Sequence, residues 1–79
     1  MDAITEYKYM GTTIKVFSNR LEYQVGLKKD MIPFRNISSI DTPKMPLIYC
    51  IYIKTNDGKK HTIATSNPKK LREQISELL

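Results

Sequence analysis

The sequence predicts a mainly β domain of about seven short strands, folded into two near-orthogonal antiparallel sheets and capped by one C-terminal α-helix. Tyr, Ile, Val and Thr dominate the first two-thirds of the 79 residues, and turn residues recur about every six to ten positions. Only at the end does the apolar pattern change to a helical period. A twisted antiparallel sheet of this length should bend over on itself into a barrel or an orthogonal sandwich, whose open corner needs a lid.

The expected strands follow one another with short turns between them. They lie near residues 4–10, 13–18, 21–27, 31–34, 37–42, 47–55 and 59–65. The turns fall at Met10-Gly11, Ser18-Asn19-Arg20, Lys28-Lys29-Asp30, Arg35-Asn36, Pro43 to Pro46 and Asn56-Asp57-Gly58. The last turn carries the strongest hairpin signal, because Asp57-Gly58 can take the positive φ angles of a tight turn between two apolar runs.

The segment MIPFRNISSID predicts the corner between the two sheets. Ile32 and Phe34 keep the two-residue spacing of a strand, whereas Ile37 follows Phe34 after three residues. Pro33 has no N–H for a ladder hydrogen bond and therefore suits the edge or the end of a strand. We expect the chain to turn sharply at Arg35-Asn36 and to pass there from one sheet to the other.

The closing segment SNPKKLREQISELL predicts the helical lid. Its apolar residues recur at helical spacing and share one face, which holds Leu71, Ile75, Leu78 and Leu79. Asn67 is placed to cap the free N–H groups of the first turn. Pro68 suits the first helical position, because its missing N–H would have no partner there. We therefore expect the apolar face of this helix to cover the open corner of the sheets.

Composition indicates one small domain over residues 1–79, since a chain this short builds a single core. Cys50 is the only cysteine and has no partner for an internal disulfide. The longest mainly apolar run, PLIYCIYI, is far shorter than the roughly 20 residues of a membrane-spanning helix. We therefore expect a cytoplasmic protein, or one peripheral to the inner membrane surface. Thirteen Lys and Arg against eight Asp and Glu give a net charge of +5, which favours anionic partners.

An ordered set of segments resembles a known family. The segments VFSNRLEY, MIPFRNISSID, IYIKTNDGKKHTI and NPKKLREQISEL span roughly residues 12 to 79. Together they resemble the bacterial pleckstrin-homology-like (PH-like) domain family. The resemblance implies a single PH-like domain with sheets of four and three strands and a C-terminal helix that plugs one end. It also implies a role in binding or assembly.

The resemblance further implies a candidate anionic-surface site. It gathers loops 1–2, 3–4 and 6–7 at an open pole away from the helix, where four lysines would converge: Lys28, Lys29, Lys59 and Lys60. Lys69-Lys70 would then lie at the opposite end. Phosphoinositide-binding members of the wider superfamily carry a basic motif across the first two strands, and Lys8 and Lys15 match its first two places. Phe17 stands where the motif has arginine and offers no forked contact to phosphate.

The residue types of catalytic and metal sites are not gathered in this sequence. Cys50 lies in the most apolar strand with no second cysteine and no neighbouring base, so we expect a buried thiol. His61 is the only histidine, and it lies in a regular hairpin with no nucleophile-elbow sequence anywhere in the chain. We therefore expect no enzyme activity, no metal and no small-molecule cofactor.

The expected function is that of a non-catalytic binding or oligomerisation module, acting in protein–protein interaction or self-assembly. Five tyrosines favour it, because so small a core cannot hide them all, and exposed rings beside an edge strand suit self-association. One alternative is a small basic β-barrel that binds nucleic acid, with tyrosines stacked on bases. Another is peripheral docking to an anionic membrane through the four lysines, although we expect no exposed apolar anchors in the same loops.

Overall fold

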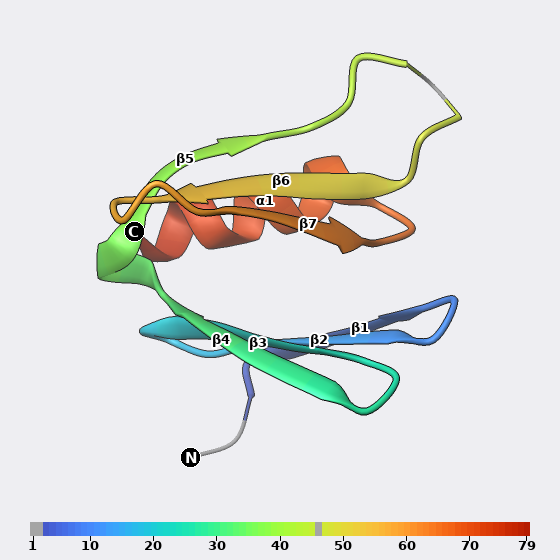
Figure 1. Cartoon of the computed structure of the whole chain (residues 1–79), viewed down its shortest axis with the longest axis horizontal. Coiled ribbons are helices and arrows are strands. Elements are labelled where there is room, and N and C mark those ends of the chain that lie inside the picture. Colours follow the sequence, from blue (N-terminus) through green and yellow to red (C-terminus); the bar gives the residue numbers. More distant parts are fainter. Residues whose placement is uncertain (1–2, 46) are drawn as a thin grey trace.

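The computed structural model describes residues 3–45 and 47–79, and within them the chain is mainly β (Figure 1). The elements in chain order are β1 (Thr5–Tyr9), β2 (Thr12–Val16), β3 (Arg20–Val25), β4 (Lys28–Pro33), the 3-10 turn η1 (Phe34–Asn36), β5 (Ile37–Asp41), β6 (Cys50–Thr55), β7 (Lys60–Ala64) and α1 (Pro68–Leu78). Pro46, which belongs to the predicted turn from Pro43 to Pro46, lies outside the described residues.

The first sheet is an antiparallel meander in the order β1-β2-β3-β4. Its strands alternate strictly, so that Ile14 and Val16 of β2, Leu21 of β3 and Ile32 of β4 face inward and are buried. The pairs Val16↔Leu21 and Leu21↔Ile32 place three of these side chains in one row across the sheet. This inward row forms one wall of the core.

The corner predicted at Arg35-Asn36 is confirmed. A 3-10 turn, η1, ends β4 at Pro33 and begins β5 at Ile37, whose N–H donates to the carbonyl of Phe34. Pro33 lies at the end of an edge strand, where its missing N–H leaves no gap in a ladder. The N–H of Phe34 donates to the carbonyl of Asn19 at 2.9 Å, which fastens the corner to the β2–β3 turn.

The second sheet is antiparallel in the order β5-β6-β7, with Ile51, Ile53 and Ile63 buried on its inner face. The predicted β6–β7 hairpin is confirmed. Its loop has three residues, because the N–H of Thr55 donates to the carbonyl of Lys59 at 3.0 Å. Within the loop Gly58 takes a positive φ of 86°, a conformation that glycine adopts without strain.

The helix begins and packs as the sequence predicts. The side chain of Asn67 accepts from the N–H of Lys70 at 3.2 Å, and Pro68 is the first helical residue. Leu71 and Ile75 are fully buried in the common core, whereas Leu79, which we expected on the same face, ends the helix and is exposed. Leu78 in the last turn is half-buried against the same core, so the helix covers the core along its length.

The helix reaches both sheets. It lies along β6 (Figure 1), and its Gln74 connects it to β1. The hydroxyl of Tyr7 donates to Oε1 of Gln74 at 2.5 Å, and Nε2 of Gln74 donates to the hydroxyl of Thr5. The two sheets remain separate layers that are not closed into a barrel, so that part of the prediction is wrong. The first sheet ends at β4, because η1 turns the chain into the second sheet and leaves no further strand to pair with β4.

Two predicted boundaries are also wrong. We expected Lys28-Lys29-Asp30 to form a turn, but the β3–β4 turn is Gly26-Leu27, and all three residues belong to β4. Gly26 takes a positive φ of 61°, which the neighbouring residues with side chains adopt only at a cost. We also expected a strand from residue 47, whereas β6 begins at Cys50. Residues 42–49 thus form a longer loop than the sequence suggested.

Candidate functional site

One end of the molecule gathers the tips of several connections, and we call it the loop end. It comprises the β1–β2 turn (10–11), the β3–β4 turn (26–27), the β5–β6 loop (42–49) and the β7–α1 loop (65–67) (Figure 1). The N–H of Gly26 lies 3.5 Å from the carbonyl of Gly11, which connects the first two turns. The rings of Tyr9 and Tyr49 meet edge to face at 6.0 Å, and the N–H of Thr65 donates to the carbonyl of Tyr49.

Backbone geometry positions the tips of these connections. Met10 and Gly11 both have positive φ, 45° and 81°, as a type I′ hairpin turn requires. A side chain larger than that of glycine, asparagine or aspartate is uncommon in this region, so Met10 is held in a strained conformation. In the β5–β6 loop the N–H of Ile48 lies 3.4 Å from the carbonyl of Met45, which turns the chain beside Leu47.

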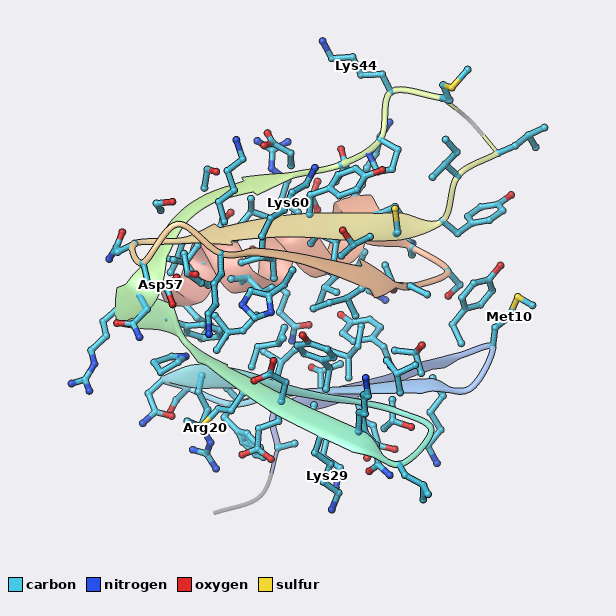
Figure 2. The ribbon with its side chains drawn as sticks, viewed as in Figure 1. Met10, Arg20, Lys29, Lys44, Asp57 and Lys60 are labelled. Carbon is cyan, nitrogen blue, oxygen red and sulfur yellow. The ribbon has the colours of Figure 1, made fainter. Side chains whose placement is uncertain are left out.

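Large apolar side chains project from the loop end into solvent. Leu27 is 100% exposed, Met10 and Leu47 are each 83% exposed, and Met45 is 66% exposed. Figure 2 shows Met10 pointing away from both sheets. Single exposed apolar residues are ordinary, but large ones at the tips of three separate connections at one end mark an interaction surface.

Basic residues accompany these apolar tips, and acidic residues do not. The loop end together with its flanking residues covers 10–11, 25–29, 42–49 and 65–70, and these segments contain no Asp or Glu, although Asp30 and Asp41 directly adjoin two of them. They contain Lys28, Lys29, Lys44, Lys69 and Lys70. Lys28 directly follows Leu27, and Lys44 directly precedes Met45, so that each charge lies beside an exposed apolar side chain. The loop end is therefore both apolar and basic.

The structure does not bring the four lysines of the expected site together. Lys59 follows the β6–β7 turn, and that turn lies at the corner, because the N–H of Asn56 donates to the carbonyl of Asn36 at 2.8 Å. Lys28 lies at the other end of β4, beside the β3–β4 turn. Lys29 points outward from the first sheet, and Lys60 points outward from the second sheet (Figure 2). The expectation that loop 6–7 lies beside loops 1–2 and 3–4 is therefore wrong. Of the four lysines of the expected site, only Lys28 and Lys29 flank the loop end.

The side chain of Lys60 makes a contact within its own sheet. Its ammonium lies 4.7 Å from the ring centre of Tyr52, within the range of a cation–π contact. Both residues lie on the face of β6 and β7 that points away from the core, as does Cys50, two positions before Tyr52. We expected Cys50 to be buried, but it is only half-buried, because the alternation of β6 gives the core positions to Ile51 and Ile53.

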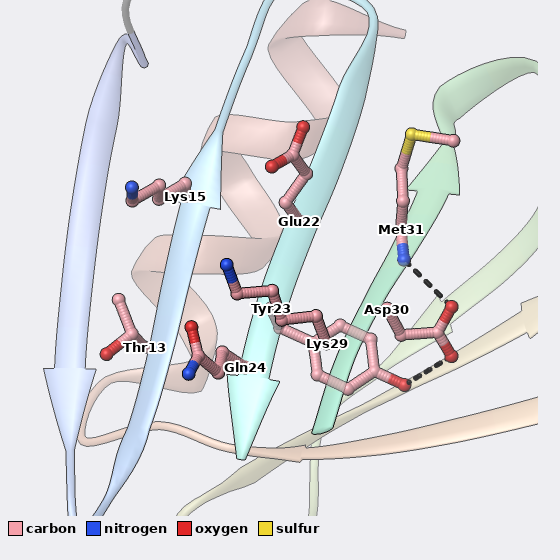
Figure 3. Close-up of a pocket in the computed structure, with 8 residues that line it drawn as sticks. All are labelled: Thr13, Lys15, Glu22, Tyr23, Gln24, Lys29, Asp30 and Met31. Carbon is pink, nitrogen blue, oxygen red and sulfur yellow. Dashed lines mark hydrogen bonds between the residues drawn. The ribbon is translucent and has the colours of Figure 1, made fainter. Parts of the chain in front are cut away.

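The outer face of the first sheet carries mixed charges. Lys8 pairs with Glu6 at 3.3 Å, and Lys15 lies opposite both Glu6 and Glu22 in the register. An open depression of about 360 Å³ lies on this face (Figure 3). Its lining includes two lysines, Lys15 and Lys29, and two carboxylates, Glu22 and Asp30. Lys15 lies opposite Glu22, whereas the carboxylate of Asp30 accepts from Tyr23 between the sheets and Lys29 lies opposite Gln24, so the depression holds one lysine paired with a carboxylate and one that is not.

Phe17, which replaces the arginine of the basic motif, is buried. Its ring receives the guanidinium of Arg20 at 4.0 Å, and Arg20 in turn pairs with Glu22 at 2.6 Å. The residue therefore has a structural place beside the corner, and its side chain gives Lys8 and Lys15 no third phosphate ligand.

A polar cluster joins the two sheets on the side of β4 and β7. The hydroxyl of Tyr23 donates to Oδ2 of Asp30 at 3.2 Å and lies 2.9 Å from Nδ1 of His61. Because a phenol has one proton, the tyrosine oxygen is left to accept from an Nδ1–H of His61. Burial, and then the charge and hydrogen bond of Asp30, raise the pKa of Tyr23 to about 12. The phenol therefore stays neutral and braces β3 and β4 against β7.

Within residues 3–45 and 47–79, no three His, Cys, Asp or Glu side chains form a group able to hold a metal ion. No helix in the described part of the chain is long and apolar enough to cross a membrane.

Comparison with family models, curated proteins and solved structures finds no match to this chain. The class that its own geometry defines is a mainly β domain of two antiparallel sheets and one C-terminal helix.

The exposure of apolar side chains at the loop tips was not predicted from the sequence. We expected no exposed apolar anchors in the loops, because the β3–β4 turn was placed at Lys28 and the PLI run was assigned to a strand. The signal for Leu27 was Gly26, the only glycine between two strand-like runs in that region. No local signal shows that the β5–β6 loop lies at the same end as this turn.

Proposed function

We propose that the chain is a non-catalytic binding module, a bacterial PH-like domain of two near-orthogonal sheets, that docks on its partner through the loop end. The observation that carries this proposal is the exposure of Met10, Leu27 and Leu47 at the tips of three connections. Full burial of a leucine side chain is worth about 1.5–3 kcal/mol, so contact with a partner would stabilise the complex substantially. The arrangement of four plus three strands with a C-terminal helix supports the PH-like assignment.

The type of side chain at the loop end narrows the class of partner. Non-specific binding of single-stranded nucleic acid relies on aromatic rings stacked on bases, together with basic side chains along the backbone. Tyr7, Tyr9 and Tyr23 lie on the inner face of the first sheet and are half-buried. Aliphatic and thioether tips favour a protein surface, a second copy of the chain or a lipid surface instead.

The proposal is tested by measuring association in three assays on the same protein. Light scattering reports self-association, vesicle co-sedimentation reports lipid binding, and a gel shift at low salt reports nucleic-acid binding. The loop-end variant carries Leu27→Ser and Leu47→Ser, and its control carries Thr62→Ala in β7 and Ser76→Ala in α1, two exposed positions outside the loop end. We expect any association of the wild type to be weakened at least tenfold in the loop-end variant and kept in the control. An association that the loop-end variant retains, or the absence of association in every assay, would overturn the proposal.

A further inference from the structure

We propose that the partner of the loop end is an anionic lipid bilayer, into whose interfacial region Met10, Leu27 and Leu47 insert. This inference rests on the proposed function and names its partner. The lysines nearest the tips, Lys28 and Lys44, then lie at the level of the lipid headgroups.

The form of the surface favours lipid over protein. Met10, Leu27 and Leu47 project from three separate connections and are 83%, 100% and 83% exposed. A protein partner would need a matching pit for each projecting side chain, whereas a lipid interface accepts projecting side chains without a fixed shape. The most exposed of them, Leu27, lies at the tip of a two-residue turn, where it can enter the interface before the rest of the hairpin.

The charge at this end favours an anionic surface. Lys28 follows Leu27 and Lys44 precedes Met45 in the chain, and no acidic residue occurs in these segments. The first helical turn, with Lys69-Lys70, begins at the same end (Figure 1), so the expectation that these two lysines lie at the opposite end from Lys28 and Lys29 is wrong. Each lysine close to an anionic leaflet contributes about fivefold to binding, and the contribution falls with ionic strength.

In the described part of the chain, the two lysines of the phosphoinositide motif do not form a headgroup site with the tips. The motif positions Lys8 and Lys15 lie on the outer face of the first sheet, where carboxylates face them, and Phe17 is buried. Binding should therefore follow the charge density of the bilayer and not the identity of the headgroup. Phosphatidylglycerol and phosphatidylserine at equal mole fraction should bind equally well, within about twofold.

The experiment measures co-sedimentation with vesicles of phosphatidylcholine containing 30% phosphatidylglycerol and with vesicles of phosphatidylcholine alone. We expect binding to the mixed vesicles to be at least tenfold tighter and to weaken with added salt. Leu27→Ser with Leu47→Ser should weaken it at least tenfold. Because both side chains are exposed in the free protein, the thermal unfolding midpoint of this variant should match that of the wild type.

Two charge variants with equal loss of net charge complete the test. Lys28→Gln with Lys44→Gln should weaken binding to the mixed vesicles by about 25-fold, since each lysine contributes about fivefold. The control, Lys59→Gln with Lys60→Gln, removes two charges away from the loop end and should weaken it by no more than about threefold. Equal losses from both pairs would show that only net charge matters and would overturn the proposal.

The remaining outcomes separate this inference from the proposed function. Equal binding to vesicles with and without phosphatidylglycerol would overturn the preference for anionic lipid. Unchanged vesicle binding by the leucine variant would overturn insertion. If no vesicle binds but the wild type self-associates and the leucine variant does not, the lipid proposal fails and docking through the loop end stands. If no assay detects association, both fail.

Discussion

The two ends of the molecule differ in how far their apolar side chains are exposed. At the corner, which holds η1 with the β2–β3 and β6–β7 turns, Phe17 and Phe34 are buried, and backbone hydrogen bonds join Phe34 to Asn19 and Asn56 to Asn36. At the loop end, Met10 and Leu27 project into solvent. Leu79 is also exposed at the corner, at 62%, but Met10 and Leu27 are 83% and 100% exposed, and this greater exposure points to a partner at the loop end.

The helix supports both ends of the molecule. Disrupting its packing on the core should therefore have the largest effect on stability. Ile75 is fully buried between the sheets. Ile75→Asp places an unpaired charge in the core and should lower the free energy of unfolding by several kcal/mol, about as much as the whole domain can lose. Urea denaturation followed by circular dichroism measures this loss. The control Ser76→Asp changes an exposed neighbour and should stay folded, whereas a folded Ile75→Asp protein would contradict the role of the helix as a lid.

A matched pair of truncations compares the ends directly. Phe34→Ala at the corner should lower the free energy of unfolding by about 3–5 kcal/mol, because it leaves a cavity beside the core. Leu27→Ala at the loop end should change it by no more than about 0.5 kcal/mol, since this side chain is fully exposed. The same denaturation measurement applies to both. Comparable losses would show that Leu27 packs within the domain and is not free for a partner.

Relief of strain at the loop end should have a smaller effect of opposite sign. Met10 has a φ of 45°, and a left-handed conformation costs an ordinary residue about 1–2 kcal/mol. Met10→Asn should therefore raise the free energy of unfolding by about 0.5–1 kcal/mol while it weakens vesicle binding. Met45→Asn is the control, because Met45 is also exposed but has no positive φ. Equal stability of the two variants would argue against strain at Met10.

The smallest effect is expected from the pH dependence of the corner. The side-chain hydrogen bond from Thr55, and then the N–H of Lys59, lower the pKa of Asp57 below its ordinary value of 3.8. A lowered folded-state pKa contributes stability above the ordinary value, and this contribution is lost as the pH falls through the lowered pKa. The stability difference between the wild type and Asp57→Asn should therefore shrink as the pH falls from about 5 through the lowered pKa of Asp57.

Urea midpoints at several pH values measure this difference. Asp41→Asn removes one carboxylate from the end of β5 and serves as the charge-matched control. A difference between the wild type and Asp57→Asn that stays constant over this range would show that the turn does not depend on the ionised carboxylate.

Local signals in the sequence were enough for the elements with local causes. The cap at Asn67 and Pro68, the spacing of Leu71 and Ile75, and the turn at Gly58 each depend on residues within one or two turns of chain. The corner at Arg35-Asn36 was likewise predictable, because a proline and a broken two-residue period lie side by side there.

Errors of two or three residues in the positions of turns and strand ends had large consequences for the predicted exposure of side chains. Placing the β3–β4 turn at Lys28 instead of Gly26 hid the exposure of Leu27 and took Lys28 and Lys29 out of a strand. In β6 the sequence showed an apolar run, but only the packing of two sheets decides that Ile51 faces the core and Cys50 faces outward. A shift of one position exchanges the two faces of a strand.

The sequence by itself determined the number of layers in outline, the strand-rich first part, the corner and the helical lid, because these follow from period, turn residues and caps. Only the tertiary structure decided which connections share an end. Lys59 lies far from Lys28 because β6 runs toward the corner, and Met10, Leu27 and Leu47 lie at one end because β1, β3 and the β5–β6 loop all lead there. The direction of each strand depends on all the strands before it, so no local sequence pattern shows at which end of the molecule a connection lies.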